Sequence, residues 1–245
     1  MMVEAPETPA RSPWHAGEIT IQRKAGVDKQ MEETGRRALR DFLPEQHRAF
    51  YPLLPYVMLG AVDPAGDVWA TVRAGQPGFM HSPDALTLHV GNARDAMDPA
   101  DSGMEDGNAI ALLGIDLMTR RRNRLNGTVR REHASGFDLL VGTSFGNCPQ
   151  YITLRDYAFV RDAASPASVA PQYADHLDER ARALIRGADA FFVASYVDRD
   201  EGGVTQRQVD VSHRGGKPGF VRIGEDSVLT VPDFAGNLFF NTLGN

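Results

Sequence analysis

The sequence predicts a mainly β protein with flanking helices (α+β), in which two related antiparallel β-barrels follow one another. Strand patterns succeed one another at short spacing, part of the sequence is repeated, and a linker rich in Ala, Ser and Pro separates the two copies. The predicted layout is an N-terminal arm and helix over residues 1–43, a first barrel over 44–160, a linker over 161–174 and a second barrel over 175–245.

Helical patterns precede the first strands. Residues 1–13 are expected to be disordered. Asp28 is a suitable N-cap for a helix that runs to about Phe42, with its apolar side chains on one stripe. Pro44 suits the first turn of a second, short helix that ends before Pro52.

Strand patterns follow in the first copy, and a helix opens the second. The predicted strands of the first copy are 56–62, 68–73, 86–90, 109–117, 118–130 and 136–141. Residues 92–108 are polar and predict a loop with a short helix. Beyond the linker, residues 177–188 place apolar side chains on one helical face, and strand patterns return after Ala190.

The repeat is clearest in the motif R-x-G-x-P-G-F, which occurs at residues 73–79 and 214–220. Upstream, residues 56–63 resemble 191–198 in apolar character and in their closing Asp. Downstream, residues 86–88 resemble 229–231. We therefore expect a duplication in which the second barrel has a longer first hairpin and is truncated at the C-terminus, as in a fragment of a longer protein. Coincidence of two Pro-Gly turns is the alternative.

Composition limits the classes of function. The net charge of −6 gives no basic field for a nucleic acid. Cys148 is the single cysteine, which fits a reducing compartment. The N-terminus has no apolar signal region, and the most apolar run, 53–62, is interrupted by Pro55 and is too short to span a bilayer. We expect a cytoplasmic protein without a membrane or nucleic-acid partner.

One hairpin corner combines cations with glycines. Residues 209–214 alternate as in a half-buried strand, and Lys217-Pro-Gly-Phe220 predicts a type II turn. Ser212, His213, Arg214 and Lys217 therefore meet beside Gly215 and Gly216, where backbone N–H groups and fixed cations could hold an anion. An ordinary polar hairpin is the alternative.

A second corner lies near the C-terminus. Asp233 is placed to cap a helix whose free N–H groups would bind a phosphate. Asn237 and Asn241 would be further donors, and Arg214 would complete the site. The alternative is that Asp233 is only a cap and the asparagines close a turn.

Two other patterns carry weaker hypotheses. Gly142-Thr-Ser-Phe-Gly146 fits the nucleophile motif of serine hydrolases, with Ser144 as nucleophile, but Pro149 disfavours the helix that this mechanism requires. Arg120, Arg122 and Arg124 share one strand face and would hold a phosphate, an acidic partner or only solvent. The histidines have no metal-ligand spacing.

Several long motifs resemble a known family. Ser212-His-Arg-Gly-Gly-Lys-Pro-Gly-Phe-Val221, Val231-Pro-Asp-Phe-Ala-Gly-Asn237 and Phe240-Asn-Thr-Leu-Gly-Asn245 resemble the pyridoxamine 5′-phosphate oxidase-like, FMN-binding split-barrel family. Ser144-Phe-Gly-Asn-Cys-Pro-Gln-Tyr-Ile152, Arg120-Arg-Arg-Asn-Arg-Leu-Asn-Gly127 and His15-Ala-Gly-Glu18 are similar to a branch often fused to a flavin reductase with a ferredoxin domain.

The resemblance implies a six-stranded antiparallel split barrel with FMN between two barrels. The repeat suggests that one chain supplies both as a pseudo-dimer, with a homodimer as the alternative. The implied cofactor-binding residues are Ser212, His213, Arg214 and Gly216 on the hairpin, Asp233, Gly236, Asn237 and Asn241 at the phosphate or ribityl end, and Asn147, Gln150 and Tyr151 from the first barrel. The family often places Arg or Lys where Leu238 stands, a departure that shifts the charge to Arg214.

These observations predict an FMN-dependent oxidoreductase of a small-molecule substrate. Its electrons would come from NAD(P)H or from a fused or separate reductase, and no catalytic protein residue is expected because the flavin performs the redox step. A non-catalytic flavin or haem module is the alternative, and a serine hydrolase is a remote one.

Overall fold

The computed structural model describes residues 12–132, 134–163, 165, 170–201 and 203–245. Most of the residues predicted to be disordered, 1–13, lie outside this part of the chain, as do five residues of the predicted linker. The helices are α1 (Ala16–Lys24), α2 (Asp28–Ala38), α3 (Glu45–Arg48), α4 (Glu179–Gly187) and α5 (Asn241–Gly244), with 3-10 turns η1 (Tyr51–Leu53) and η2 (Pro99–Gly103). The strands are β1 (Tyr56–Val62), β2 (Val68–Ala74), β3 (Met80–Asp84), β4 (Thr87–Val90), β5 (Ala109–Asp116), β6 (Arg121–Arg130), β7 (Phe137–Gly146), β8 (Ala190–Glu201), β9 (Val204–Gly215), β10 (Arg222–Ile223) and β11 (Leu229–Thr230).

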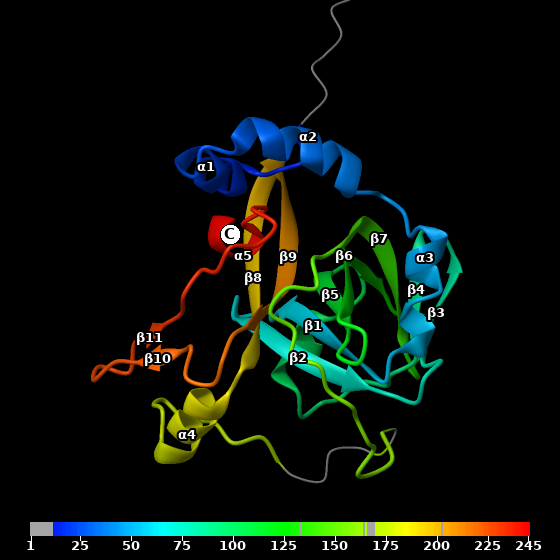
Figure 1. Cartoon of the computed structure of the whole chain (residues 1–245). Helices are drawn as coiled ribbons and strands as arrows, with labels where there is room; N and C mark the ends of the chain where they lie inside the picture. The colour runs from blue at the N-terminus through cyan, green and yellow to red at the C-terminus, as the bar shows by residue number, and fades with distance from the viewer. Residues whose placement is uncertain (1–11, 133, 164, 166–169, 202) are drawn as a thin grey trace, which may run out of the picture.

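The first half of the chain folds into a seven-stranded antiparallel sheet with the order β2-β1-β5-β6-β7-β4-β3 (Figure 1). Strand patterning explains the core, because alternate residues of each strand point to the same face. Leu59, Leu88, Leu112, Leu125 and Leu139 come from five different strands and are fully buried in one cluster. The prediction of a mainly β fold with flanking helices is confirmed.

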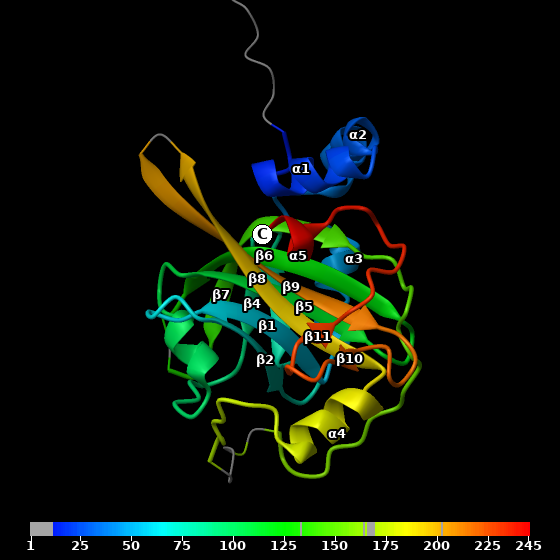
Figure 2. The ribbon, with the colours of Figure 1, turned by 90° about the vertical axis from the view of Figure 1, so that its left-hand side faces the viewer.

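The second half adds a long hairpin, β8–β9, which crosses the outer face of β1 and β5 (Figure 2). Val209 and Val211 on β9 pack against Ala111 and Leu113 on β5 in a second apolar cluster. A Cβ atom at Gly60 on β1 would lie 3.2 Å from the Asp210 carbonyl oxygen, so the hairpin approaches the sheet closely there.

The second half does not form the second barrel that the repeat predicts. Beyond α4, the described residues form the two-stranded sheets β8–β9 and β10–β11, and no closed barrel is detected in the first half either. The physical reason lies in the strands that follow β4 in the first copy. The described residues of the second copy include no counterparts of β5, β6 and β7, and its hairpin buries apolar residues against the first sheet.

The repeated turn nevertheless has one geometry in both copies. The N–H groups of Phe79 and Phe220 donate to the carbonyls three residues before them, at 2.9 and 3.0 Å. Gly78 and Gly219 have φ of +100° and +83°, as a type II turn requires at its third residue. Next to the turn the two hairpins pair alike, Tyr56 with Ala74 and Ala190 with Gly215, so Tyr56 corresponds to Ala190. The predicted match of residues 56–63 with 191–198 is therefore shifted by one residue.

Two sequence-predicted helices differ from the structure. Helix α2 ends at Ala38 instead of about Phe42, because the chain enters an extended stretch that pairs Arg40 with Ser144 on β7. The helix expected after Asp233 is not formed, and α5 begins only at Asn241. Positive φ values at Leu238 and Phe240 interrupt helical geometry before it.

Helix α1 lies against α5, so the N-terminal arm covers the C-terminal segment (Figures 1 and 2). The helices touch so closely that a Cβ atom at Gly17 would overlap the carbonyl oxygen of Gly244. The His15 side chain accepts from the N–H of Gly17 and caps α1. Among the described helices, none has the length and apolarity needed to cross a membrane.

Candidate functional site

A cavity of about 180 Å³ lies where the two halves of the chain meet. Strand β6 and the loop after β7 form one side, β9 forms another, and the irregular segment 232–240 with the start of α5 closes it. The basic and acidic side chains that line the cavity are Arg122, Arg124, His213, Arg214 and Asp233.

Arg124 is the most deeply held of these cations, with 5% of its surface exposed. Its Nη1 lies 2.9 Å from Oδ1 of Asp210 and donates to Oδ1 of Asn241 at 2.9 Å. Its Nη2 donates to Oγ of Ser212 at 2.8 Å, and Ser212 donates to Asp210. Burial lowers the pKa of Arg124, and the nearby Asp210 carboxylate partly opposes this decrease. Residues from β6, β9 and α5 therefore hold one guanidinium in place.

Arg122 and His213 form a second pair at the cavity. Nε of Arg122 donates to the Cys148 carbonyl at 2.8 Å, and its Nη1 lies 3.4 Å from Nδ1 of His213. Burial, and then the neighbouring Arg124, lowers the pKa of Arg122 to about 10. Burial and the Arg122 charge lower the pKa of His213 to about 4, so its imidazole is neutral at neutral pH.

The cavity carries excess positive charge. Arg122, Arg124 and Arg214 contribute three guanidinium groups, while Asp210 and Asp233 provide two carboxylates. Asp233 is half exposed, and its Oδ1 is 3.7 Å from Nη1 of Arg214, which is too long for a strong charge-assisted hydrogen bond. An anion could therefore take its place beside Arg214.

Aromatic rings separate the cavity from a wider groove of about 880 Å³. Tyr151 stacks on Phe234 with ring centroids 5.3 Å apart, and Phe234 stacks on Phe220 at 6.5 Å. The Tyr151 hydroxyl donates to the Ala235 carbonyl at 2.9 Å, which joins the first half to the closing segment. This wall offers a flat apolar surface next to a cationic cavity.

The structure brings ten of the eleven sequence-predicted site residues to the cavity. They are Asn147, Gln150, Tyr151, Ser212, His213, Arg214, Asp233, Gly236, Asn237 and Asn241. Gly216 lies on the wider groove instead. Asp233 does not cap a helix, so the expected anion site at a helix N-terminus is wrong, and arginine side chains supply the positive charge. Asn237 accepts from the N–H of Phe239 at 3.2 Å.

Arg122, Arg124 and Phe234 line the cavity. The sequence predicts the two arginines only as part of a row that holds a phosphate, an acidic partner or solvent, and it does not single out Phe234. The alternation of side chains along β6 indicates that the two arginines share a face: Asn123 and Leu125 turn inward, while Arg122 and Arg124 turn toward β9. Such a row is indistinguishable from a solvated strand face until the position of the hairpin is known.

The serine hydrolase hypothesis is wrong. Ser144 is fully buried within β7, and its Oγ donates to the Phe42 carbonyl at 2.6 Å. A nucleophile must be presented at a sharp turn before a helix.

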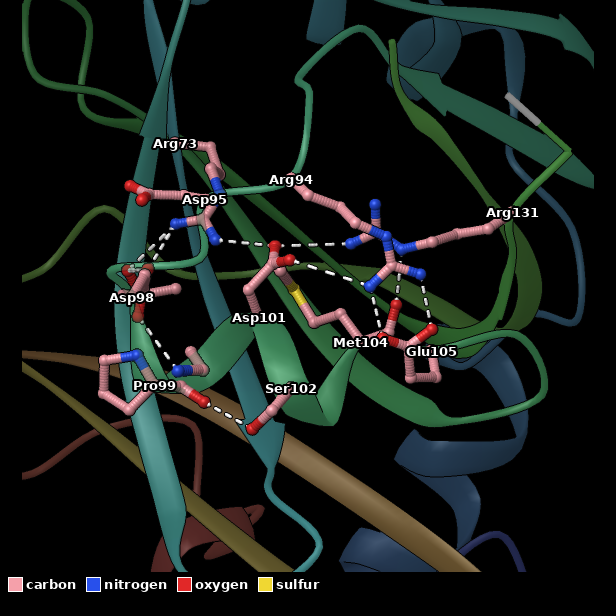
Figure 3. Close-up of polar contacts among 12 residues, drawn as sticks. Arg73, Arg94, Asp95, Asp98, Pro99, Asp101, Ser102, Met104, Glu105 and Arg131 are labelled. Atoms are coloured by element: carbon pink, nitrogen blue, oxygen red, sulfur yellow. Dashed lines mark hydrogen bonds and ion pairs between the residues drawn. The ribbon is translucent and has the colours of Figure 1, made fainter. Parts of the chain in front are cut away.

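The first copy has the same corner, but its own carboxylates occupy it (Figure 3). Arg73 is the counterpart of Arg214, and it pairs with Asp98 and with Asp101, whose Oδ1 is 3.1 Å from Nη2 of Arg73. Asp101 also pairs with Arg131 at 3.3 Å. Of these two corners, the one at Arg214 therefore has the arginine whose charge is only partly neutralised.

No family model matches the sequence, and no curated protein matches it. Among the solved structures that are similar, three have a TM-score of 0.34 each. One is a protein from Lactobacillus delbrueckii described as a candidate pyridoxamine 5′-phosphate oxidase, 18% identical, with 43% of this chain and 95% of that chain covered. The others are structures of HupZ from Group A Streptococcus, each 15% identical, with 42% of this chain and 98% or 93% of the HupZ chain covered.

Proposed function

We propose that the cavity binds FMN and that the chain is an FMN-dependent oxidoreductase. The observation that carries the proposal is the convergence of Arg122, Arg124 and Arg214 on one cavity with too few carboxylates to neutralise them. A phosphate monoester is the ligand group that best uses several guanidinium donors at once.

Unpartnered polar atoms support a ligand that also carries hydroxyl groups. Oδ1 of Asn147, Oγ1 of Thr242 and Nε of Arg124 are buried without a hydrogen-bond partner among the described residues. All three residues line the cavity. Buried polar groups are rarely left unpaired, so these atoms suit a ribityl chain next to a phosphate.

The volumes suit a ligand with a narrow anionic end and a flat ring. Ligand pockets usually enclose about 300–1,000 Å³, so the 180 Å³ cavity suits only part of a flavin. The adjoining groove, with Tyr151, Phe220 and Phe234 along it, has room for an aromatic ring system. In this arrangement the arginines would hold the phosphate and the aromatic wall would orient the ring.

FMN supplies electron transfer itself when bound, and the protein binds, orients and shields it. The neutral imidazole of His213 adds no charge to the cavity at neutral pH. Ser212 and Asn241 keep Arg124 in position. The substrate is a small molecule that reaches the wider groove, and the electrons come from NAD(P)H or from a fused or separate reductase.

We propose that both sides of the site come from one chain, as in a pseudo-dimer. The β8–β9 hairpin packs on the first sheet and brings Ser212 to Arg124.

A binding module without turnover is the second candidate, and His213 favours haem as its ligand. A neutral imidazole at a cavity is suited to coordinating iron.

Visible absorption and FMN titration separate these functions. We expect FMN to bind with quenched flavin fluorescence and NAD(P)H, or a reductase, to bleach its visible band. Bound flavin that no donor reduces would favour the binding module, and a haem spectrum with weak FMN binding would favour haem. A protein that binds neither ligand would contradict both candidates.

A further inference from the structure

Glu18 is a carboxylate that the N-terminal arm buries beside the site. Only 6% of its surface is exposed. Its Oε2 accepts from the backbone N–H of His15 at 3.0 Å, and its Oε1 accepts from Nδ2 of Asn241 at 2.6 Å. Glu18 does not line the cavity, but Asn241 does.

The hydrogen-bond partners of Asn241 fix the orientation of its side-chain amide. A carboxylate only accepts hydrogen bonds and a guanidinium only donates them, so the amide must direct Nδ2 to Glu18 and Oδ1 to Arg124. Arg124 then donates to Ser212 at 2.8 Å. An unbroken series of hydrogen bonds therefore joins α1 to the cavity wall.

We propose that Glu18 is a positioning residue of the anion site: it orients Asn241, which holds Arg124, and its charge sets how tightly the cavity binds a dianion. This inference rests on the proposed function, because it takes the cavity as an anion site.

Charged groups surround Glu18 on each packed element. Nε2 of His15 lies 3.5 Å from Oε2, and Asp210 on β9, Arg199 on β8 and Arg124 on β6 act on the carboxyl electrostatically. His15 accepts from Gly17 through Nδ1, so its neutral ring donates from Nε2 to Asn245.

Burial raises the pKa of Glu18 to about 7, and the Asp210 carboxylate adds to the increase, while hydrogen bonds from His15 and Asn241 oppose it. Below this pH Glu18 is neutral, and above it the series of hydrogen bonds gains a negative charge. We therefore expect anion affinity to fall as the pH rises through 7.

Sulfate is the appropriate probe, because it stays a dianion from pH 6 to 8.5 whereas a phosphate monoester titrates near pH 6. Within the cavity, His213 with a pKa of about 4 and Arg122 with a pKa of about 10 titrate outside this window. A Cys148→Ser background removes the thiol from the cavity lining.

Sulfate affinity measured by calorimetry should fall about fivefold from pH 6 to 8.5, at the low end of typical coupling between sites. Glu18→Gln keeps an acceptor for Asn241 without the charge, so it should bind with the same affinity at every pH, close to that of the unsubstituted protein at pH 6. Glu18→Ala removes the acceptor and should bind more weakly than Glu18→Gln throughout.

A pH-independent affinity in the unsubstituted protein, or an unchanged pH dependence in Glu18→Gln, would overturn the inference. Equal affinity of Glu18→Ala and Glu18→Gln would exclude the positioning role, and if Glu18→Ala does not fold, the pH profile of Glu18→Gln decides. Absence of FMN binding at every pH, with pH-dependent sulfate binding retained, would instead contradict the proposed function alone.

Discussion

Arg73 and Arg214 occupy the same position of the repeat, but they differ in what neutralises them. Arg73 is 7% exposed and pairs with Asp98 and Asp101, whereas Arg214 is 30% exposed and faces Asp233 at 3.7 Å. One arginine therefore stabilises the fold, and the other remains available to an anion.

Replacing these two arginines should separate stability from binding. Arg214→Ala should weaken FMN binding about 10- to 100-fold, as expected for a lost charge-assisted hydrogen bond, with little change in stability. Arg73→Ala should leave FMN affinity nearly unchanged but cost about 3–5 kcal/mol, because it leaves buried carboxylates unpaired. Fluorescence titration and urea unfolding measure both, and equal losses of affinity would contradict the assignment.

Glu18 and His213 should have opposite effects on the pH dependence of stability. The pKa of His213 falls from 6.5 to about 4 on folding, so its contribution to stability is lost as the pH drops from about 6.5 to 4. The pKa of Glu18 rises from 4.5 to about 7, so its contribution is lost as the pH rises through that range.

Between pH 4.5 and 6.5 these two effects should offset each other in the unsubstituted protein. Relative to the unsubstituted protein, the free energy of unfolding of Glu18→Gln should gain about 2 kcal/mol over this interval, and that of His213→Asn should lose about as much. The double variant should return to the profile of the unsubstituted protein. Urea unfolding at both pH values is the measurement, and parallel profiles for the two single variants would contradict the assigned shifts.

At the scale of elements, the repeated turn provides a matched pair of positions. A Cβ atom at Gly216 would lie 2.7 Å from the ring of Phe220, and one at Gly75 would overlap the ring of Phe79. Phe220 belongs to the aromatic wall, whereas Phe79 packs against the main core.

Gly216→Ala should therefore reduce FMN affinity, because the displaced Phe220 ring disturbs the wall. Each of the two substitutions should cost about 1–3 kcal/mol of stability, but Gly75→Ala should leave the FMN affinity unchanged. Thermal unfolding and fluorescence titration of both variants give the comparison. Unchanged affinity in Gly216→Ala would exclude Phe220 from the site.

Elements with purely local signals are predictable from this sequence, and those that depend on distant contacts are not. The turn at residues 217–220 follows from Pro218 and Gly219, whose backbone preferences need no partner. The segment after Asp233 has a plausible cap, yet no helix forms there. Phe239 packs instead between Trp14 and Phe145, and burial of this ring outweighs a weak local helical preference.

At the scale of the molecule, the position of the hairpin on the sheet decides whether a site exists. At Gly60 the hairpin lies close to the sheet, with the Cβ atoms of Ala194 and Val211 each 3.3 Å from where its own Cβ would lie. Gly60→Val should push the hairpin outward, separate Ser212 from Arg124 and lower both stability and FMN affinity.

Gly187→Ala is the control for this substitution, because no atom lies within 4 Å of its added Cβ. The free energy of unfolding of Gly187→Ala should differ from that of the unsubstituted protein by less than about 0.5 kcal/mol. Unchanged FMN affinity in Gly60→Val would indicate that the cavity does not depend on hairpin docking.

The sequence by itself determined six of the seven strands of the main sheet, missing only β3, as well as the Pro-Gly turns and the duplicated hairpin. Alternation of side chains and Pro-Gly conformations act between neighbouring residues. Its resemblance to a known family also assigned Arg214, Asn147 and Asn241 to one predicted site, and all three line the cavity. Only the tertiary structure decided that β9 lies beside β6 and that α1 reaches Asn241. Those contacts depend on which apolar faces bury each other between residues 88 to 223 positions apart in the sequence, and no local pattern encodes that choice.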